Sequence, residues 1–196
     1  MQQIVRNSNS VFFNFLFKIT FFLLLTNNLN GQNKLVYGIE RTDQYISILK
    51  KKKIGLVTNH TSKFYVNKPI HLIDSLINRG IIIERIFAPE HGFRGNIDNG
   101  EKIDNSVDSK TKIPIVSLYG NSRKPAPEDI SELDLIIFDI QDVGARFYTY
   151  LSTLHYIMEA SAENRIKVIV FDRPNPNGHY IDAVSYTHLT LPTNTV

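Results

Sequence analysis

Residue types suited to acid–base or ion-binding chemistry gather in five short segments of the chain. The densest is the block FDIQDVGARFYTY at residues 138–150, which carries Asp139, Gln141, Asp142, Arg146 and Tyr148. The other four segments carry His, Glu, Asn or Arg side chains and span residues 59–61, 89–95, 119–125 and 172–178. Connecting loops need turn residues, but they do not need Glu, His and Arg within five positions. These segments therefore indicate a functional site.

Two carboxyl groups that face each other are what cleavage of a glycosidic bond requires. Glu90 is the candidate acid, because it follows an apolar run whose partial burial would raise the pKa of its carboxyl group. His91 would tune Glu90, bind a sugar hydroxyl or itself transfer protons. Asp139 or Asp142 would supply the second carboxylate. The residues leave open which of these two aspartates does so.

Arginines in the same segments are suited to an anionic substituent. Arg94 and Arg146 each offer a planar fork of N–H donors that fits a carboxylate. A plainer interpretation is that Asp139 and Arg146 pair with each other and cap the following helix.

Other site chemistries find less support. His60, Glu90, His91, Asp139 and Asp172 would suit zinc or magnesium, but they show no ligand-spacing signature. There is no Cys for a thiolate or disulfide, no G-x-G-x-x-G after the first expected strand and no G-x-S-x-G elbow. We therefore expect no cofactor and no metal.

The elements that position these segments alternate between strands and helices. Short apolar runs predict buried strands at 54–58, 81–87, 113–118, 133–140 and 167–171. Helical spacing of Ile70, Ile73, Leu76 and Ile77 predicts a helix over 69–79, with Gly80 ending it. A second helix is expected to end near Asn164, with one buried face made of Phe147, Tyr150, Leu151, Leu154, Ile157, Met158 and Ser161.

Strands that alternate with helices predict an α/β fold, an open parallel sheet with helices on both faces. The carboxyl ends of parallel strands line one crevice. Each polar segment follows one of the predicted strands, so the five segments are expected to meet in a single active site.

The first 31 residues are set apart as a signal peptide. They hold two apolar runs and then a polar, Asn-rich stretch, with cleavage expected near Gly31. An uncleaved anchor is the alternative, but Asn14 and Lys18 leave the apolar run short of the ~20 residues of a full span. Either interpretation predicts export, and after cleavage we expect no stable membrane insertion.

Net charge and the absence of Cys limit which partners and which cellular compartment the sequence supports. Of the 22 basic residues, Arg6 and Lys18 lie in the leader, which leaves 20 against 19 acidic residues. A nearly neutral chain gives no electrostatic case for a nucleic-acid partner. An exported chain without disulfides fits a bacterial periplasm or outer surface.

The last residues, 183–196, continue no strand or helix pattern. We interpret them as a non-native tail that resembles translated adapter or vector sequence, with a genuine Thr-rich tail as the alternative. The domain between the two ends is expected to span residues 32–182.

Together the motifs resemble the exo-β-N-acetylmuramidase family, long catalogued as a domain of unknown function. The resemblance runs from about Tyr37 to Asp182. It is carried by TNHT at 58–61, APEHGFRG at 88–95, SLYG at 117–120, RKP at 123–125, the block 138–150 and DRPNP at 172–176.

The resemblance implies removal of terminal N-acetylmuramic acid from the non-reducing end of peptidoglycan-derived glycans, for cell-wall recycling or scavenging. It also implies a Rossmann-like amino-terminal domain whose cleft is completed by a second, carboxyl-terminal domain. Because the match stops at Ala183, that second domain is expected to be missing, and this chain alone is expected to be inactive, with apolar surface left uncovered.

Carried over residue by residue, the family's Glu-His pair falls on Glu90 and His91. Its Asp-x-Gln-Asp motif falls on Asp139, Gln141 and Asp142, and its arginines fall on Arg94, Arg146 and Arg173. Ala88 departs from the Gly that the family often has before Pro-Glu-His-Gly. The lactyl carboxylate of muramic acid would give the arginines their role. The full predicted substrate-binding set is Asn59, His60, Arg94, Gln141, Arg146, Tyr148, Asp172, Arg173 and Asn175.

Two other functions remain open on the residues. One is a metal-dependent carbohydrate esterase or amidase on the same polymer. The other is a muropeptide-binding module without catalysis, since α/β sheets bind ligands at strand ends whatever the chemistry. Retaining or inverting stereochemistry, glycan length and oligomeric state are not determined by the sequence.

Overall fold

The computed structural model describes residues 35–65, 68–89, 93–94, 106–120, 122–145 and 147–179, together with Lys18. The ranges from Val36 onward belong to one compact unit, Val36–Val196. The predicted signal peptide, Lys18 excepted, and the predicted tail lie outside the described residues. In the part of the chain that is described, no helix is both long and apolar enough to cross a membrane.

A six-stranded sheet forms the centre of the fold, in the order β5-β6-β4-β1-β7-β8. Five strands are parallel: β1 (Lys53–Thr58), β4 (Ile82–Ala88), β6 (Pro114–Ser117), β7 (Leu135–Asp139) and β8 (Lys167–Val170). In chain order they lie 3-2-1-4-5, the order of a Rossmann-type sheet. The short β5 (Ser106–Val107) pairs antiparallel with β6 at the edge and was not predicted. The α/β class with a mostly parallel sheet is confirmed.

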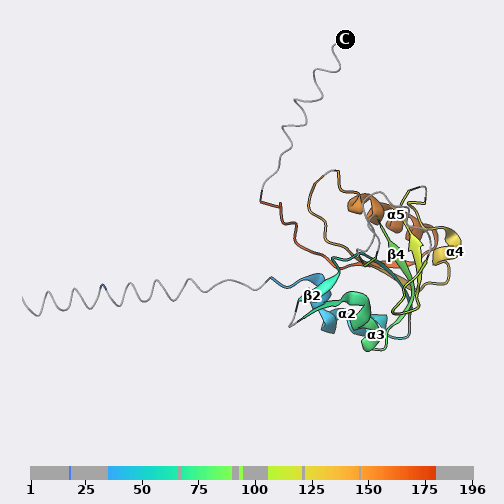
Figure 1. Ribbon diagram of the computed structural model, residues 1–196, viewed down its shortest axis with the longest axis horizontal. Helices are drawn as coiled ribbons and strands as arrows, with labels where there is room; N and C mark the ends of the chain where they lie inside the picture. The colour runs from blue at the N-terminus through green and yellow to red at the C-terminus, as the bar shows by residue number, and fades with distance from the viewer. Residues whose placement is uncertain are drawn as a thin grey trace, which may run out of the picture. The chain divides into compact units, whose positions relative to one another are not determined.

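Helices cover both faces of this sheet. The short 3₁₀ helix η2 (Gly38–Glu40) leads into α2 (Thr42–Leu49), and α3 (Leu72–Asn78) precedes β4. On the other side, α4 (Pro127–Ile130) precedes β7 and α5 (Tyr150–Glu163) precedes β8. Figure 1 shows α2 and α3 on one side of the strands and α4 and α5 on the other.

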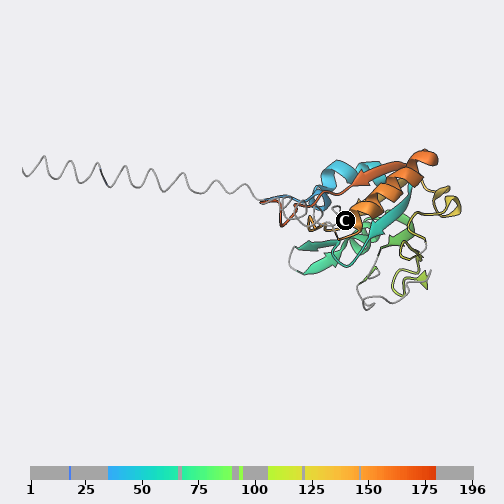
Figure 2. The same ribbon diagram turned by 90° about the horizontal axis from the view of Figure 1, so that it is seen from above.

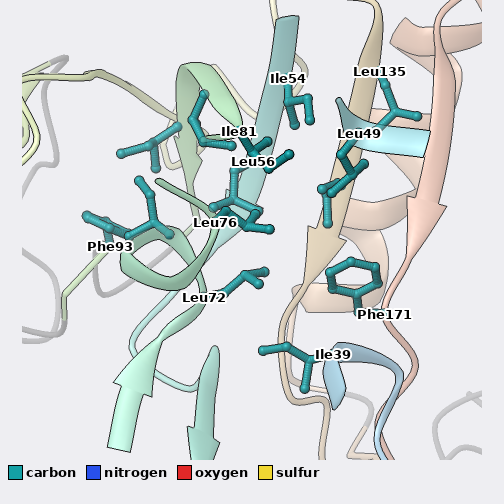
Figure 3. Close-up of a cluster of buried hydrophobic side chains, with 14 of the residues drawn as sticks. Ile39, Leu49, Ile54, Leu56, Leu72, Leu76, Ile81, Phe93, Leu135 and Phe171 are labelled. Atoms are coloured by element: carbon teal, nitrogen blue, oxygen red, sulfur yellow. The ribbon is translucent and has the colours of Figure 1, made fainter. Parts of the chain in front are cut away.

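Two buried clusters fill the layers. One joins α2 and α3 to the strands through residues such as Leu49, Leu76 and Leu56 (Figure 3). The other joins α4 and α5 to the opposite face through Ile130 and Ile157. Both faces of the inner strands are therefore covered, which is why all five residues of β7 are buried and the strand sequences are apolar throughout.

One predicted helix begins later than expected. Pro69–His71, the start of the expected helix, is strand β3 and pairs antiparallel with β2 (Lys63–Tyr65). Ile70, which was part of the helical spacing, therefore lies in this strand and is exposed. Pro fixes an extended entry that suits a strand, and helix α3 starts only after His71.

Gly80 ends α3 as predicted. Its φ of +73° lies in the left-handed region. Its N–H bonds Ile77 O at 2.9 Å, and the N–H of Ile81 bonds Leu76 O at 3.1 Å. This hydrogen-bond pair is the Schellman motif, which satisfies two of the last carbonyl groups of a helix.

Helix α5 is one continuous helix (Figure 2). Its buried face is rotated relative to the face that the sequence predicted. The buried residues on α5 are Tyr150, Thr153, Ile157, Ala160 and Ser161. Leu151 and Met158, expected in the core, are 71% and 53% exposed, and Phe147, ahead of the helix, is 78% exposed. Tyr150, Ile157 and Ser161 are buried as predicted, so apolarity indicated part of the buried face. Thr153 and Ala160 complete that face in place of Leu151 and Met158.

The edge strand β8 is also more exposed than its sequence indicated. Its two central residues are half-buried and Val170 is exposed. Among the described residues β8 has a partner strand only on the β7 side, so its outer edge and adjoining side chains are less covered.

Gly55 in the central strand should not tolerate a side chain. A Cβ at this position would lie 2.7 Å from Leu133 Cδ1 and 2.9 Å from the Phe87 ring. We expect Gly55→Ala to lower the free energy of unfolding by about 1–3 kcal/mol, as overpacking a filled core does. Urea denaturation measures this change.

Gly178→Ala is the comparison variant, because its added carbon would meet one tight contact, Asn175 O at 3.2 Å, in an exposed loop and not in the core. We expect it to cost less than Gly55→Ala, under about 1 kcal/mol. Equal stability of Gly55→Ala and wild type would contradict the packing described for β1.

Candidate active site

The central strand β1 lies where the strand order reverses. The parallel strand that follows it in the chain, β4, lies on one side, and β7 lies on the other. Cα pairing places Thr58 beside Asp139 and Val57 beside Phe87, so the segments after these three strands begin at one edge. Ligands bind outside the carboxyl ends of the strands at such a switch point. The segments after β1, β4 and β7 therefore begin at one edge of the sheet, and the single active site stays a prediction.

Asp139 is fully buried at this point and is held by two neighbouring segments. Arg173 Nε donates to its Oδ1 at 2.6 Å and Arg173 NH2 to its Oδ2 at 3.1 Å. The hydroxyl of Ser62 also donates to Oδ2. The Arg173 side chain is only 4% exposed. Both charges are therefore out of water and satisfied by each other, which is the condition for a buried ion pair to be tolerated.

A hydrogen-bonded chain connects the loop after β1 to the loop after β7. Asn59 Oδ1 accepts from Thr61 N at 2.9 Å and from Thr61 Oγ1 at 2.6 Å. The N–H of Gln141 donates to Thr61 Oγ1 at 3.0 Å, and Gln141 Nε2 donates to Pro174 O at 2.9 Å. Asn59 and Gln141, predicted to bind substrate, thus hold three loops together.

The loops after β7 and β8 also support each other directly. Asn177 Nδ2 donates to Val143 O at 2.8 Å. Gly144 has a φ of +70°, and a Cβ there would collide with the side chain of Asn175. The N–H of Gly144 donates to Asp142 Oδ2 at 2.9 Å. The position of Asp142 is therefore set by a glycine turn that only a residue without a side chain allows.

A cavity of about 460 Å³ opens beside this turn and the start of α5. It is lined by Asp142, Gly144, Ala145, Tyr148, Leu151, Ser152, His155 and Tyr156. Asp142 and Tyr148 were predicted, whereas the three polar residues of α5 were not. Ser152, His155 and Tyr156 follow Tyr148 by four, seven and eight positions, a helical spacing that places polar side chains on one face and is visible in the sequence.

The two candidate second carboxylates have different environments. Asp139 is fully buried with both oxygens bonded and lines neither this cavity nor the one described below. Asp142 is half-buried and lines the cavity. This geometry favours Asp142 as the group that contacts a substrate and gives Asp139 the role of holding the loops.

Arg94, expected to hold an anionic substituent, already has carboxylate partners. Its Nε and NH2 donate to the two oxygens of buried Asp108, both at 2.9 Å, and Asp74 lies 3.6 Å away. The hydrogen bonds from Arg94 are the main reason that the pKa of Asp108 lies well below its usual range. These hydrogen bonds in turn raise the pKa of Arg94. Arg94 thus joins the segment after β4 to the segment before β6.

Some of the remaining predicted site residues lie among the described residues and others lie outside them. His60 is half-buried, and Asp172 and Asn175 are exposed at the end of β8. Glu90, His91 and Arg146 lie outside the described residues, so their roles stay predictions. Within the described part, no three His, Asp or Glu side chains are placed to hold a metal ion. The metal alternative, which included Glu90 and His91, stays a prediction as well.

His71 is a buried polar residue that the sequence analysis missed. Its Nδ1 accepts from Ile73 N at 3.3 Å and caps α3, and its Nε2 lies 2.9 Å from Asn59 O. An accepting Nδ1 fixes the neutral tautomer that donates from Nε2. Burial lowers the pKa of His71, so the neutral form is favoured. His71 therefore connects helix α3 to the loop that holds Asn59.

Asp139 should be essential for stability. We expect Asp139→Asn to lower the free energy of unfolding by about 3–5 kcal/mol, because it leaves Arg173 as a buried charge without a charged partner. Asp142→Asn, at a half-buried position, should change it by less than about 1 kcal/mol. Chemical denaturation of the two variants side by side is the measurement, and similar losses in both would refute the division of roles.

His71 should make stability fall in mild acid. Its folded pKa lies below the ordinary 6.5, so its stabilising contribution is complete above that pH and is lost as pH falls toward the folded pKa. Asp108 contributes in a lower window, below its ordinary 3.8. Thermal unfolding of wild type and His71→Asn between pH 8 and 5 separates the effects.

The Asn variant keeps a capping oxygen but has no titrating ring. We expect wild type to lose stability below about pH 6.5 relative to the variant. Parallel pH profiles for the two proteins would show that His71 is not the titrating group.

Comparisons with known proteins identify relatives of this chain. The family model described as exo-beta-N-acetylmuramidase NamZ, N-terminal, matches residues 54–188. The match includes 183–188, the start of the segment interpreted as a non-native tail. The peptidoglycan beta-N-acetylmuramidase NamZ of Bacillus subtilis (strain 168) is 46% identical over 136 residues, which cover 68% of this chain and 32% of the relative.

Solved structures show the same likeness. Two DUF1343 family proteins from Bacteroides fragilis NCTC 9343 superpose with a TM-score of 0.63 each. The first is 45% identical, and the match covers 75% of this chain and 37% of the solved one. The second is 42% identical, and the match covers 71% of this chain and 35% of the solved one. This chain spans about a third of the length of these relatives. It belongs to the exo-β-N-acetylmuramidase NamZ family and corresponds to its N-terminal region.

Proposed function

We propose that the chain carries part of the active site of a glycoside hydrolase that releases terminal N-acetylmuramic acid from the non-reducing end of peptidoglycan fragments. The observation that supports this most directly is the cavity at the carboxyl edge of the sheet, with Asp142 in its wall. The 46% identical relative named a peptidoglycan beta-N-acetylmuramidase supports the substrate class.

In the proposed mechanism, Asp142 is the second carboxylate. The backbone N–H of Gly144 fixes one of its oxygens, so the carboxylate has a defined direction at the cavity wall. It would activate water or attack the sugar, while Glu90 protonates the departing oxygen and His91 assists. Ser152 and His155 on α5, and Tyr148 just before that helix, would contact the sugar ring.

We propose that the rest of the cleft is formed by parts of the protein that correspond to the remaining length of the relatives, of which this chain spans about a third. Exposed apolar side chains beside the cavity support this proposal. Phe147 and Leu151 are 78% and 71% exposed, and large apolar side chains gathered on a surface mark contact sites. Residues 32–182 tested by themselves would offer a glycan only one wall of the cleft, so we expect them to show weak or absent turnover.

We further propose that the protein is exported and acts in cell-wall recycling or scavenging. The apolar leader and the absence of Cys support export to a periplasm or outer surface. Export would bring the enzyme to peptidoglycan fragments. No cofactor and no nucleic-acid partner are part of this proposal.

Asp142→Asn tests the mechanism. We join residues 32–182 to the remaining part of the Bacillus subtilis relative and measure release from a chromogenic N-acetylmuramic acid glycoside. Asp142→Asn should lower kcat by about 10²–10⁴-fold, because it removes a reacting carboxylate. Glu132→Gln, an exposed carboxylate just before β7, is the matched control and should keep full activity.

Full activity of Asp142→Asn would remove Asp142 from the mechanism. No release from the glycoside, together with chelator-sensitive release of acetate or peptide from peptidoglycan fragments, would favour the metal-dependent esterase or amidase. A folded chimaera that binds the glycoside without release would favour the binding module.

A further inference from the structure

A second cavity of about 310 Å³ lies on the other side of Ser152 and Tyr156, which line both cavities. Its wall consists of Leu118, Tyr119, Arg123, Thr149, Ser152, Thr153 and Tyr156. Five of these seven side chains carry a hydroxyl group, and one is a guanidinium. A wall rich in hydroxyls with one fixed positive charge suits a hydroxylated ligand that carries a negative charge.

Arg123 differs from Arg94 and Arg173, the predicted site arginines in the part of the chain that the structure describes. Arg94 and Arg173 are each bidentate to a buried aspartate. Arg123 donates from Nε to Gly120 O at 3.3 Å and, within the described residues, forms no ion pair. Its guanidinium therefore remains available to an anion, whereas the other two are neutralised inside the protein.

The segment that carries Arg123 is attached to its surroundings. The N–H of Leu118 donates to Ala88 O at 2.8 Å at the end of β6. Lys124 Nζ lies 2.8 Å from Glu163 and 3.1 Å from Glu159, both on α5. The neighbour of Arg123 thus ties this segment to the helix that forms the opposite wall of the cavity.

The local charges also favour an anion. None of the residues in the cavity wall is acidic. The first turn of α5 has no acidic side chain either, so the partial positive charge of that helix end is not opposed there. This helix end adds to the effect of the guanidinium and does not define the site by itself.

We propose that this second cavity is a subsite for the carboxylate-bearing substituent of an amino sugar acid, with Arg123 as the group that binds the carboxylate. The proposal rests on the proposed function for its substrate class. Because Ser152 and Tyr156 are shared, a sugar in the Asp142 cavity would extend its acidic substituent past these two residues to Arg123. Arg123 is then a specificity-determining residue, in place of Arg94.

The test compares two sugars that differ only in the acid. Isothermal titration calorimetry of this chain is carried out with N-acetylmuramic acid and with N-acetylglucosamine, which lacks the lactyl carboxylate. Wild type should prefer N-acetylmuramic acid. Arg123→Gln should weaken binding of that sugar by at least about tenfold, the value of hydrogen bonds to a charged group, and leave N-acetylglucosamine unchanged.

Two further variants sharpen the comparison. Arg123→Lys keeps the charge but loses the planar fork, so it should retain part of the preference. Arg79→Gln, an exposed arginine at the opposite, amino edge of the strands, should bind both sugars as wild type does. Arg123 is exposed with one weak backbone contact, so its variants should unfold at the wild-type temperature.

Three results would overturn the subsite: Arg123→Gln that keeps the preference, a loss that is equal for both sugars, or a wild type without any preference. The glycosidase proposal fails on a different measurement, the release assay. Selective loss in Arg123→Gln without turnover by the chimaera would leave the anion subsite standing and remove the hydrolase.

Discussion

The ion pair between Asp139 and Arg173 is the constraint on which the carboxyl edge of the sheet depends. Two charges that are almost completely out of water must satisfy each other, because a lone charge in that place would cost several kcal/mol. The pair joins the last residue of β7 to the segment after β8, and Ser62 adds the loop after β1. Three loops that carry site residues are thereby fixed to one buried carboxylate.

The position of the other aspartate follows from this anchor. Thr61 and Gln141 extend the polar contacts outward from the buried pair, and Gly144 turns the chain so that Asp142 lines a cavity. Two aspartates three positions apart thus have different roles. Asp139 has both carboxylate oxygens hydrogen-bonded and holds the loops, while Asp142 lines the cavity. A reacting carboxylate needs such a support, since small displacements of reacting groups cost large factors in rate.

The sheet was predictable from the sequence because inner parallel strands are buried on both faces, which leaves uninterrupted apolar runs such as 54–58. Patterns near the edges failed for a physical reason. Pro69–His71 pairs with β2, and α5 buries Thr153 and Ala160 while it exposes Leu151, so tertiary contacts override local apolarity. In the site, residue types pointed to segments that the structure brings to one edge of the sheet. Which carboxylate each arginine binds depends on partners 14 and 34 positions away, which no local pattern specifies.

An arginine in a polar site is easily taken for a group that binds the substrate. Not every such arginine is free to bind an anion, however. A guanidinium that is bidentate to a buried carboxylate has a neutralised charge and fixed donors, so it offers little to a ligand. Arg94 and Arg173 are in this state, and Arg123 is not. In the proposed site, recognition of the acid would therefore come from the segment after β6, and bond cleavage from the segments after β4 and β7. Because these functions lie on separate loops of one edge, a substitution in the first should change the choice of sugar without displacing Asp142.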